Sequence, residues 1–96
     1  MPQFLILATD FTDDGASDRR LQVRNNHLER MKVQRQLGNF ICGGAMLDDA
    51  GIMRGSMLVV VLDSIEEVLQ WIAEDPYVLG NVWDGVSVKP FKMADV

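Results

Sequence analysis

Hydrophobic and polar positions follow two different periodicities along the chain, and the changes between them predict its elements. Residues 3–9 (QFLILAT) are a short apolar run that ends in a cluster of turn-forming residues, a pattern typical of a buried strand. Residues 16–37 contain no Pro or Gly and are mostly helix-forming, and Gly38 follows where helices commonly end. The chain therefore begins with a strand and one long helix.

The middle of the chain predicts a hairpin. Residues 40–47 are rich in strand-forming side chains, although the pair Gly43-Gly44 interrupts them. Residues 48–51 (DDAG) form a turn signal, and residues 56–63 (SMLVVVLD) are a second apolar run. We expect two antiparallel strands here.

The last third of the sequence predicts a helix, a short helical turn and a final strand. Ser64 and Glu67 form a capping box, which opens a helix with apolar residues on one face. Asp75 and Pro76 then suit the N-cap and first position of a short helical turn. Residues 86–91 read as the last strand, and Pro90 confines it to a sheet edge or to a strand end.

The resulting order, strand-helix-strand-strand-helix-strand, predicts an α+β fold of the ferredoxin-like kind, βαββαβ, with an antiparallel four-stranded sheet. Both helices would cover one face of that sheet. The first and third strands are apolar at odd and even positions alike, which indicates burial of both faces. A second copy of the sheet is the simplest cover, so we expect a homodimer.

Composition narrows the functional classes. The 96 residues suit a single domain, residues 1–96, and the net charge of −5 argues against a nucleic-acid partner. One cysteine, Cys42, and one histidine leave no disulfide framework and no metal site. No nucleotide or redox-cofactor motif is present, so we expect no cofactor. Without a signal sequence or a membrane-spanning run, a cytoplasmic location and no membrane partner are expected.

One helix carries most of the positive charge. It holds six of the nine Lys and Arg residues, and Arg20, Arg24, His27 and Met31 share one face at helical spacing. This stripe is either a solvated face or the wall of a cleft. In the second case His27 would exchange protons near neutral pH, with Asp75 as the group that sets its tautomer.

Several further candidates have a structural and a functional interpretation. In the structural interpretation Asp75 caps a helix, and in the functional one it orients His27. Gly44, with Gly43, either marks a bulge or presents backbone N–H groups to an anion. Tyr77 and Trp83 either line a pocket or fill the core.

Five segments together carry a resemblance to a known family. They are residues 24–31 (RNNHLERM), 55–57 (GSM), 63–67 (DSIEE), 71–77 (WIAEDPY) and 86–92 (VSVKPFK). In this order and spacing, which spans nearly the whole chain, the sequence resembles the YciI-like (YCII-related) family of small bacterial proteins. The resemblance implies a dimeric α/β-barrel of ferredoxin-like subunits, with a cleft built around a His and an Asp that match His27 and Asp75. It also implies a scaffold capable of proton transfer, since a related member is a dehydrochlorinase.

These observations lead to two functional hypotheses. In the first, a cytoplasmic enzyme performs cofactor-free lyase or isomerase chemistry on a small anionic or phenolic molecule, with His27 and Asp75 as the catalytic pair. Its ligand would be bound by Arg24, Arg20, Gly44 and Tyr77. In the second, the same dimer is a non-catalytic module that binds a small ligand or a partner protein. Neither the substrate nor any assembly above the dimer follows from the sequence.

Overall fold

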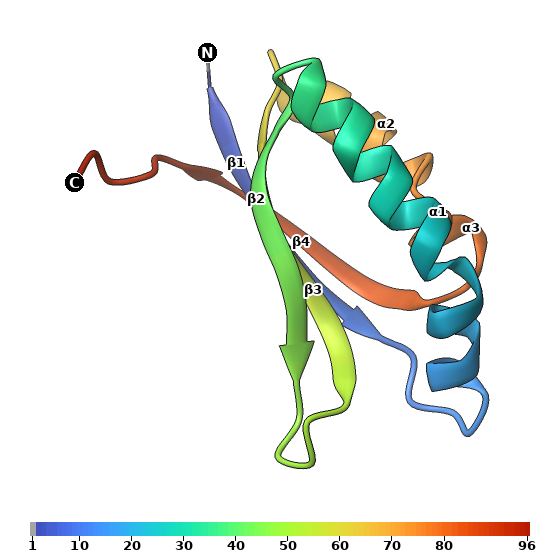
Figure 1. Ribbon diagram of the computed structural model, residues 1–96. Helices are drawn as coiled ribbons and strands as arrows, with labels where there is room; N and C mark the ends of the chain where they lie inside the picture. The colour runs from blue at the N-terminus through green and yellow to red at the C-terminus, as the bar shows by residue number, and fades with distance from the viewer. Residues whose placement is uncertain (1) are drawn as a thin grey trace.

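A computed structural model describes residues 2–96 and shows one sheet covered on one face by helices (Figure 1). Its elements are β1 (Gln3–Asp10), α1 (Ala16–Gln36), β2 (Phe40–Leu47), β3 (Met53–Val61), α2 (Ile65–Ala73), α3 (Pro76–Leu79) and β4 (Trp83–Phe91). The four strands are antiparallel in the order β2-β3-β1-β4. The predicted ferredoxin-like α+β fold is confirmed.

The core lies between the sheet and the helices. Alternate residues of β1, namely Phe4, Ile6 and Ala8, turn toward the helices and are buried, as the two-residue period of a strand requires. From β3 they meet Leu58 and Val60, which are also fully enclosed. The helices contribute to this cluster Met31, Val68, Trp71, Ile72 and Tyr77. This packing holds α1 against the sheet. The helix face with Arg20, His27 and Met31 is therefore buried.

The helix ends follow the sequence signals closely. Gly38 comes directly after the C-cap of α1 with φ of 84°, a left-handed conformation that favours glycine. Ser64 Oγ accepts a hydrogen bond from the Glu67 N–H at 3.2 Å at the start of α2. The Glu67 carboxylate accepts a hydrogen bond from the N–H of Asp63 at 3.0 Å, whereas a capping box would pair it with the N–H of Ser64 itself.

The bounds of two strands differ from the prediction by more than one residue. β3 runs from Met53 to Val61 rather than over 56–63, and β4 begins at Trp83 rather than at residue 86. β3 is extended by pairing with both of its neighbours, since Thr9 of β1 faces Gly55 and Leu47 of β2 faces Met53. β4 is extended by pairing with β1, where Asp10 faces Trp83. Glycines and charged residues at these starts obscured strands that their neighbours in the sheet impose.

The second face of the sheet is not covered by any helix of residues 2–96. Its side chains include Leu5, Leu7, Met57 and Val61, all of them half-buried. The C-terminal residues extend away from the helices, on the side of this open face (Figure 1). Among the described helices, none has the length and apolar character needed to cross a membrane.

Candidate active site

Asp75 is fixed by the turn that starts α3. It is the N-cap residue, with Pro76 at the first helical position, and one carboxylate oxygen accepts a hydrogen bond from the Tyr77 N–H at 2.9 Å. Its side chain is completely buried. A buried carboxylate needs partners for its charge and its lone pairs, and α1 supplies them.

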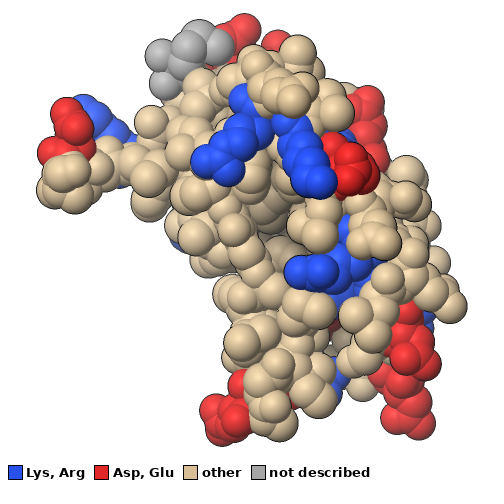
Figure 2. Space-filling view, in the orientation of Figure 1, with Lys and Arg blue, Asp and Glu red and all other residues tan. Residues whose placement is uncertain are grey.

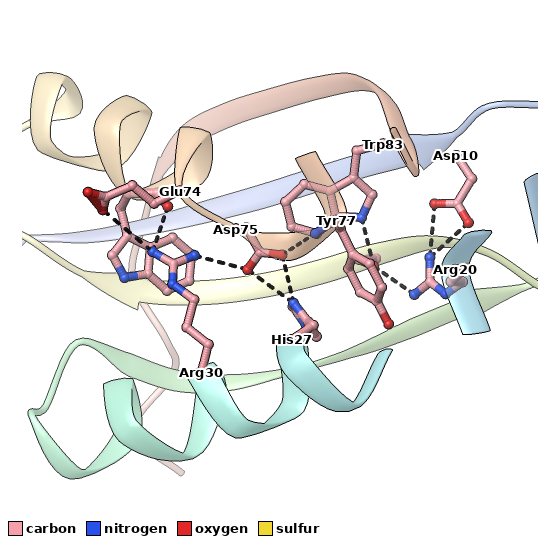
Figure 3. A network of polar contacts seen from close by, with 10 residues as sticks. Asp10, Arg20, His27, Arg30, Glu74, Asp75, Tyr77 and Trp83 are labelled. Atoms are coloured by element: carbon pink, nitrogen blue, oxygen red, sulfur yellow. Dashed lines mark hydrogen bonds and ion pairs between the residues drawn. The ribbon is translucent and has the colours of Figure 1, made fainter. Parts of the chain in front are cut away.

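His27 of α1 lies directly against Asp75. Its Nδ1 is 2.9 Å and 3.0 Å from the two carboxylate oxygens (Figure 3). A carboxylate only accepts hydrogen bonds, so Nδ1 carries a proton and, in the neutral ring, Nε2 carries the lone pair. The imidazole also stacks on Tyr77, with 4.1 Å between ring centroids. The structure thus brings together the two residues predicted to form the pair.

Arg30 is the third partner of this group, and the sequence reasoning missed it. Its Nη1 donates to Asp75 at 3.0 Å, its Nη2 donates to the Trp71 carbonyl at 2.7 Å, and its guanidinium lies over the Trp71 ring. Arg30 follows His27 by three residues and so shares its helix face. That spacing was the signal that could have found it. Asp75 therefore has two basic partners from α1, which fix the carboxylate from both sides.

Arg20 lies two helical turns before His27 on α1 and is only 3% exposed. Its Nη1 donates to both oxygens of Asp10, at 2.9 Å and 2.8 Å, and its Nη2 donates to Ser56 at 2.9 Å. The guanidinium also lies 4.5 Å from the Tyr77 ring centroid. The solvated-face interpretation is therefore wrong for Arg20 and His27, both of which are buried. Direct ligand binding by Arg20 stays a prediction, since both Nη atoms have protein partners.

A cavity of ≈ 180 Å³ lies between α1 and the β2-β3 hairpin. His27, Arg24, Gly44 and Tyr77, all predicted site residues, line it together with Ser56. The rest of its wall is mostly apolar and includes Leu28, Met31, Phe40 and Leu58. In Figure 2, Lys and Arg side chains gather on this side of the molecule, beside a hollow between α1 and the sheet. The cavity suits a small molecule with an apolar body.

Besides His27, the cavity wall presents the polar groups of Arg24 and Tyr77. Arg24 is half-buried and makes no ion pair with any part of the chain that the structure describes. Burial raises the pKa of Tyr77 above its ordinary value of 10.0, although the nearby Arg20 and Arg24 oppose that shift. The phenol therefore stays protonated at neutral pH. An oxygen-bearing ligand would meet one cation and one neutral hydroxyl here.

The glycine pair and Trp83 are also placed by the structure. A Cβ on Gly43 would come 2.6 Å from the Met57 carbonyl oxygen, whereas a Cβ on Gly44 would meet nothing within 4 Å. The register shifts between β2 and β3 lie between Phe40 and Cys42 and between Met46 and Leu47, so the pair itself is not the bulge. Trp83 belongs to the core and does not line the cavity.

Comparison with known proteins identifies the family. The model of the YCII-related domain matches residues 3–92. This chain belongs to that family. Protein YciI of Escherichia coli O6:H1 is 35% identical over 95 residues, which cover 93% of this chain and 95% of the relative. An uncharacterized protein of Haemophilus influenzae is 32% identical over 96 residues, with the same coverage. The resemblance drawn from the five segments is confirmed.

Solved structures confirm the fold of this YCII-related chain. The 5-chloro-2-hydroxyhydroquinone dehydrochlorinase TftG from Burkholderia phenoliruptrix AC1100, in complex with 2,5-dihydroxybenzoquinone, aligns with a TM-score of 0.81 at 24% identity. The alignment covers 96% of this chain and 95% of TftG. A dimeric ferredoxin-like protein from an uncultured marine organism aligns over 98% of this chain and 99% of its own, with a TM-score of 0.52 at 16% identity.

Proposed function

We propose that this chain is an enzyme that transfers a proton between His27 and a small, oxygen-bearing ring compound, without a cofactor. The observation that carries the proposal is the orientation of the imidazole. Its Nδ1 is committed to the buried Asp75, while the same residue lines the cavity. Its free nitrogen, Nε2, is therefore the one available to a bound molecule.

The chemistry follows from this arrangement. As a general base, Nε2 would take a proton from a carbon or hydroxyl of the ligand, and the imidazolium that forms would be stabilised by the Asp75 carboxylate. The released electron pair would stay on the ligand, where it forms a double bond if a leaving group such as chloride departs. Returning the proton to another atom would instead complete an isomerisation. Arg30 holds the Asp75 carboxylate in place during either reaction.

The cavity supports a ligand that is anionic or phenolic. Arg24 offers a positive charge without a competing acidic partner among residues 2–96, and charge-assisted hydrogen bonds favour carboxylate and phenolate oxygens. The apolar wall formed by residues such as Leu28 and Phe40 suits a ring. The structural neighbour TftG, a dehydrochlorinase with a dihydroxybenzoquinone bound, supports the same class.

A homodimer is part of this proposal. The open face of the sheet carries half-buried apolar side chains, and a second copy of the face would bury them. The dimeric ferredoxin-like neighbour supports this assembly. Light scattering during gel filtration at micromolar concentration should give about twice the mass of 10.8 kDa. A monomer under these conditions would contradict the assembly.

Proton exchange tests the enzyme against the binding module. The ring hydrogens of 2,5-dihydroxybenzoquinone in D₂O report proton transfer by proton NMR, and calorimetry reports its binding. We expect the wild-type protein to accelerate the exchange and His27→Gln to reduce the acceleration about 100-fold or more, while retaining binding. Asp75→Asn, which keeps an oxygen for the Tyr77 N–H, should also slow the exchange. Equal exchange rates in wild type and His27→Gln would favour the non-catalytic module.

A further inference from the structure

Ser56 of β3 is a buried hydroxyl at the wall of the cavity. It is only 3% exposed, and the sequence reasoning gave it no role. Its oxygen receives two hydrogen bonds: Arg20 Nη2 donates at 2.9 Å and Trp83 Nε1 donates at 3.2 Å. Its place at the start of the apolar run 56–62 was the signal that could have pointed to it.

The two incoming donors determine what this hydroxyl can do. A serine oxygen has two lone pairs and one proton, and a guanidinium and an indole N–H can only donate. Both lone pairs of Ser56 are therefore occupied, and its own O–H must find an acceptor elsewhere. Within residues 2–96 none of the side-chain hydrogen bonds has this hydroxyl as its donor. The positive charge of Arg20 strengthens the O–H as a donor.

The acceptor that completes this group would come from the cavity. Arg20 has no acceptor atom, and the nearby Asp10 carboxylate is bonded to Arg20 Nη1 and not to the Ser56 hydroxyl. The ring of Tyr77 lies between this cluster and the imidazole of His27, and both flanking residues contact it (Figure 3). Ser56, through its bond to Arg20, and His27 therefore belong to one cluster around the Tyr77 ring, and both line the cavity.

We propose that Ser56 is a ligand-binding residue that donates its hydroxyl proton to a carbonyl, enolate or phenolate oxygen of the bound ring. This rests on the proposed function and names the substrate class more closely. The substrate carries an acceptor oxygen at the part of the cavity wall formed by Ser56, in addition to the atom that His27 deprotonates. A group that only donates hydrogen bonds, such as an ammonium, is rejected at this position, because the oxygen of Ser56 has no lone pair left to receive it.

The test measures binding of 2,5-dihydroxybenzoquinone by calorimetry. Ser56→Ala should weaken binding about 10- to 100-fold, the scale of a hydrogen bond to a charged or strongly polar oxygen. Ser56→Thr, which keeps the hydroxyl, should restore affinity to within a few fold. Ser64→Ala is the matched control, because it removes a serine hydroxyl that caps α2 outside the cavity. It should leave the affinity unchanged.

Infrared difference spectra separate ligand contact from a merely structural role. A hydrogen bond from Ser56 lowers the carbonyl stretching frequency of the bound probe, so the wild-type and Ser56→Thr spectra should show a shift that Ser56→Ala lacks. Unchanged affinity and spectrum in Ser56→Ala would overturn the inference, as would absence of binding to the wild-type protein. If the wild type binds in a Ser56-dependent way but does not accelerate proton exchange, the inference stands and the proposed function fails. If exchange depends on His27 while binding does not depend on Ser56, the proposed function stands and the inference fails.

Discussion

The buried ion pair between Asp10 and Arg20 offers a demanding test of how the site is held. Both side chains are 4% exposed, and Arg20 Nη1 lies within 2.9 Å of both carboxylate oxygens. Asp10→Asn keeps the size of the side chain but removes its charge. The guanidinium would then remain buried with a positive charge, a donor to Ser56 and no counter-ion.

The expected loss is a large part of the total stability. Removing one partner of a buried ion pair typically costs about 3–5 kcal/mol, because the remaining charge stays desolvated. A domain of this size has about 5–15 kcal/mol in all. Asp10→Asn should therefore lower the midpoint of thermal unfolding by at least about 12 °C, at about 4 °C per kcal/mol. The double variant Asp10→Leu with Arg20→Met should recover much of the loss, because it removes both charges.

Urea unfolding followed by tryptophan fluorescence, at one fixed protein concentration, measures the differences in the free energy of unfolding. A thermal scan at the same concentration measures the shift of the midpoint. Asp13→Asn is the matched control, since Asp13 pairs with Arg19 at 2.7 Å on the exposed surface and solvent screens that pair. Its loss should be far smaller. A loss of less than about 1 kcal/mol in Asp10→Asn, or a double variant less stable than the single one, would refute the reasoning.

Local geometry and charge support three further predictions. Gly43→Ala should destabilise the fold by about 1–3 kcal/mol in urea unfolding, because its Cβ would come 2.6 Å from a backbone oxygen, whereas Gly44→Ala should be close to neutral. Arg19 lowers the pKa of Asp13 to about 2 from 3.8, so the stability gap between wild type and Asp13→Asn should be present above pH 3.8 and close as the pH falls through about 2. Because the pKa of Tyr77, the sole tyrosine, is raised, the absorbance of tyrosinate should appear only above pH 10.0 in a spectrophotometric titration. The neutral phenol contributes to the free energy of unfolding below that pH, and this contribution is lost as the pH rises through the pKa of the folded protein.

The sequence was informative where local chemistry determines structure. The capping box at Ser64, the Asp75-Pro76 turn and the glycine after α1 each act within a few residues, and each was found where the structure has it. Helical spacing also placed Arg20 and His27 on one face. Whether that face lies against solvent or against the sheet depends on how elements far apart in the sequence pack together. The spacing of residues along one helix gives no information about that packing.

Partners from distant parts of the chain were the harder part of the site. Arg30 and Asp75 are 45 positions apart, and Ser56 is 36 positions from Arg20. Arginine, aspartate and serine usually lie on the protein surface, so the sequence alone does not mark these positions. They become part of a site only because folding places them next to an opposite charge or a hydrogen-bond donor. Long-range pairing also explains why β3 starts at Met53 and β4 at Trp83. These residues are in strands because they pair with Leu47 of β2 and Asp10 of β1.

Asp75 has two roles, and this limits where the ligand specificity of such a protein can change. One carboxylate both begins α3 and orients the imidazole, so any substitution there alters the chain path along with the chemistry. The opposite wall is built differently: β2 is an edge strand, and Gly44 and Ala45 line the cavity while exposed to solvent. Side chains added at residue 44 meet empty space and disturb no buried neighbour. Divergence among relatives, and laboratory selection for new ligands, should therefore accumulate along β2 while the α1 and α3 side stays fixed.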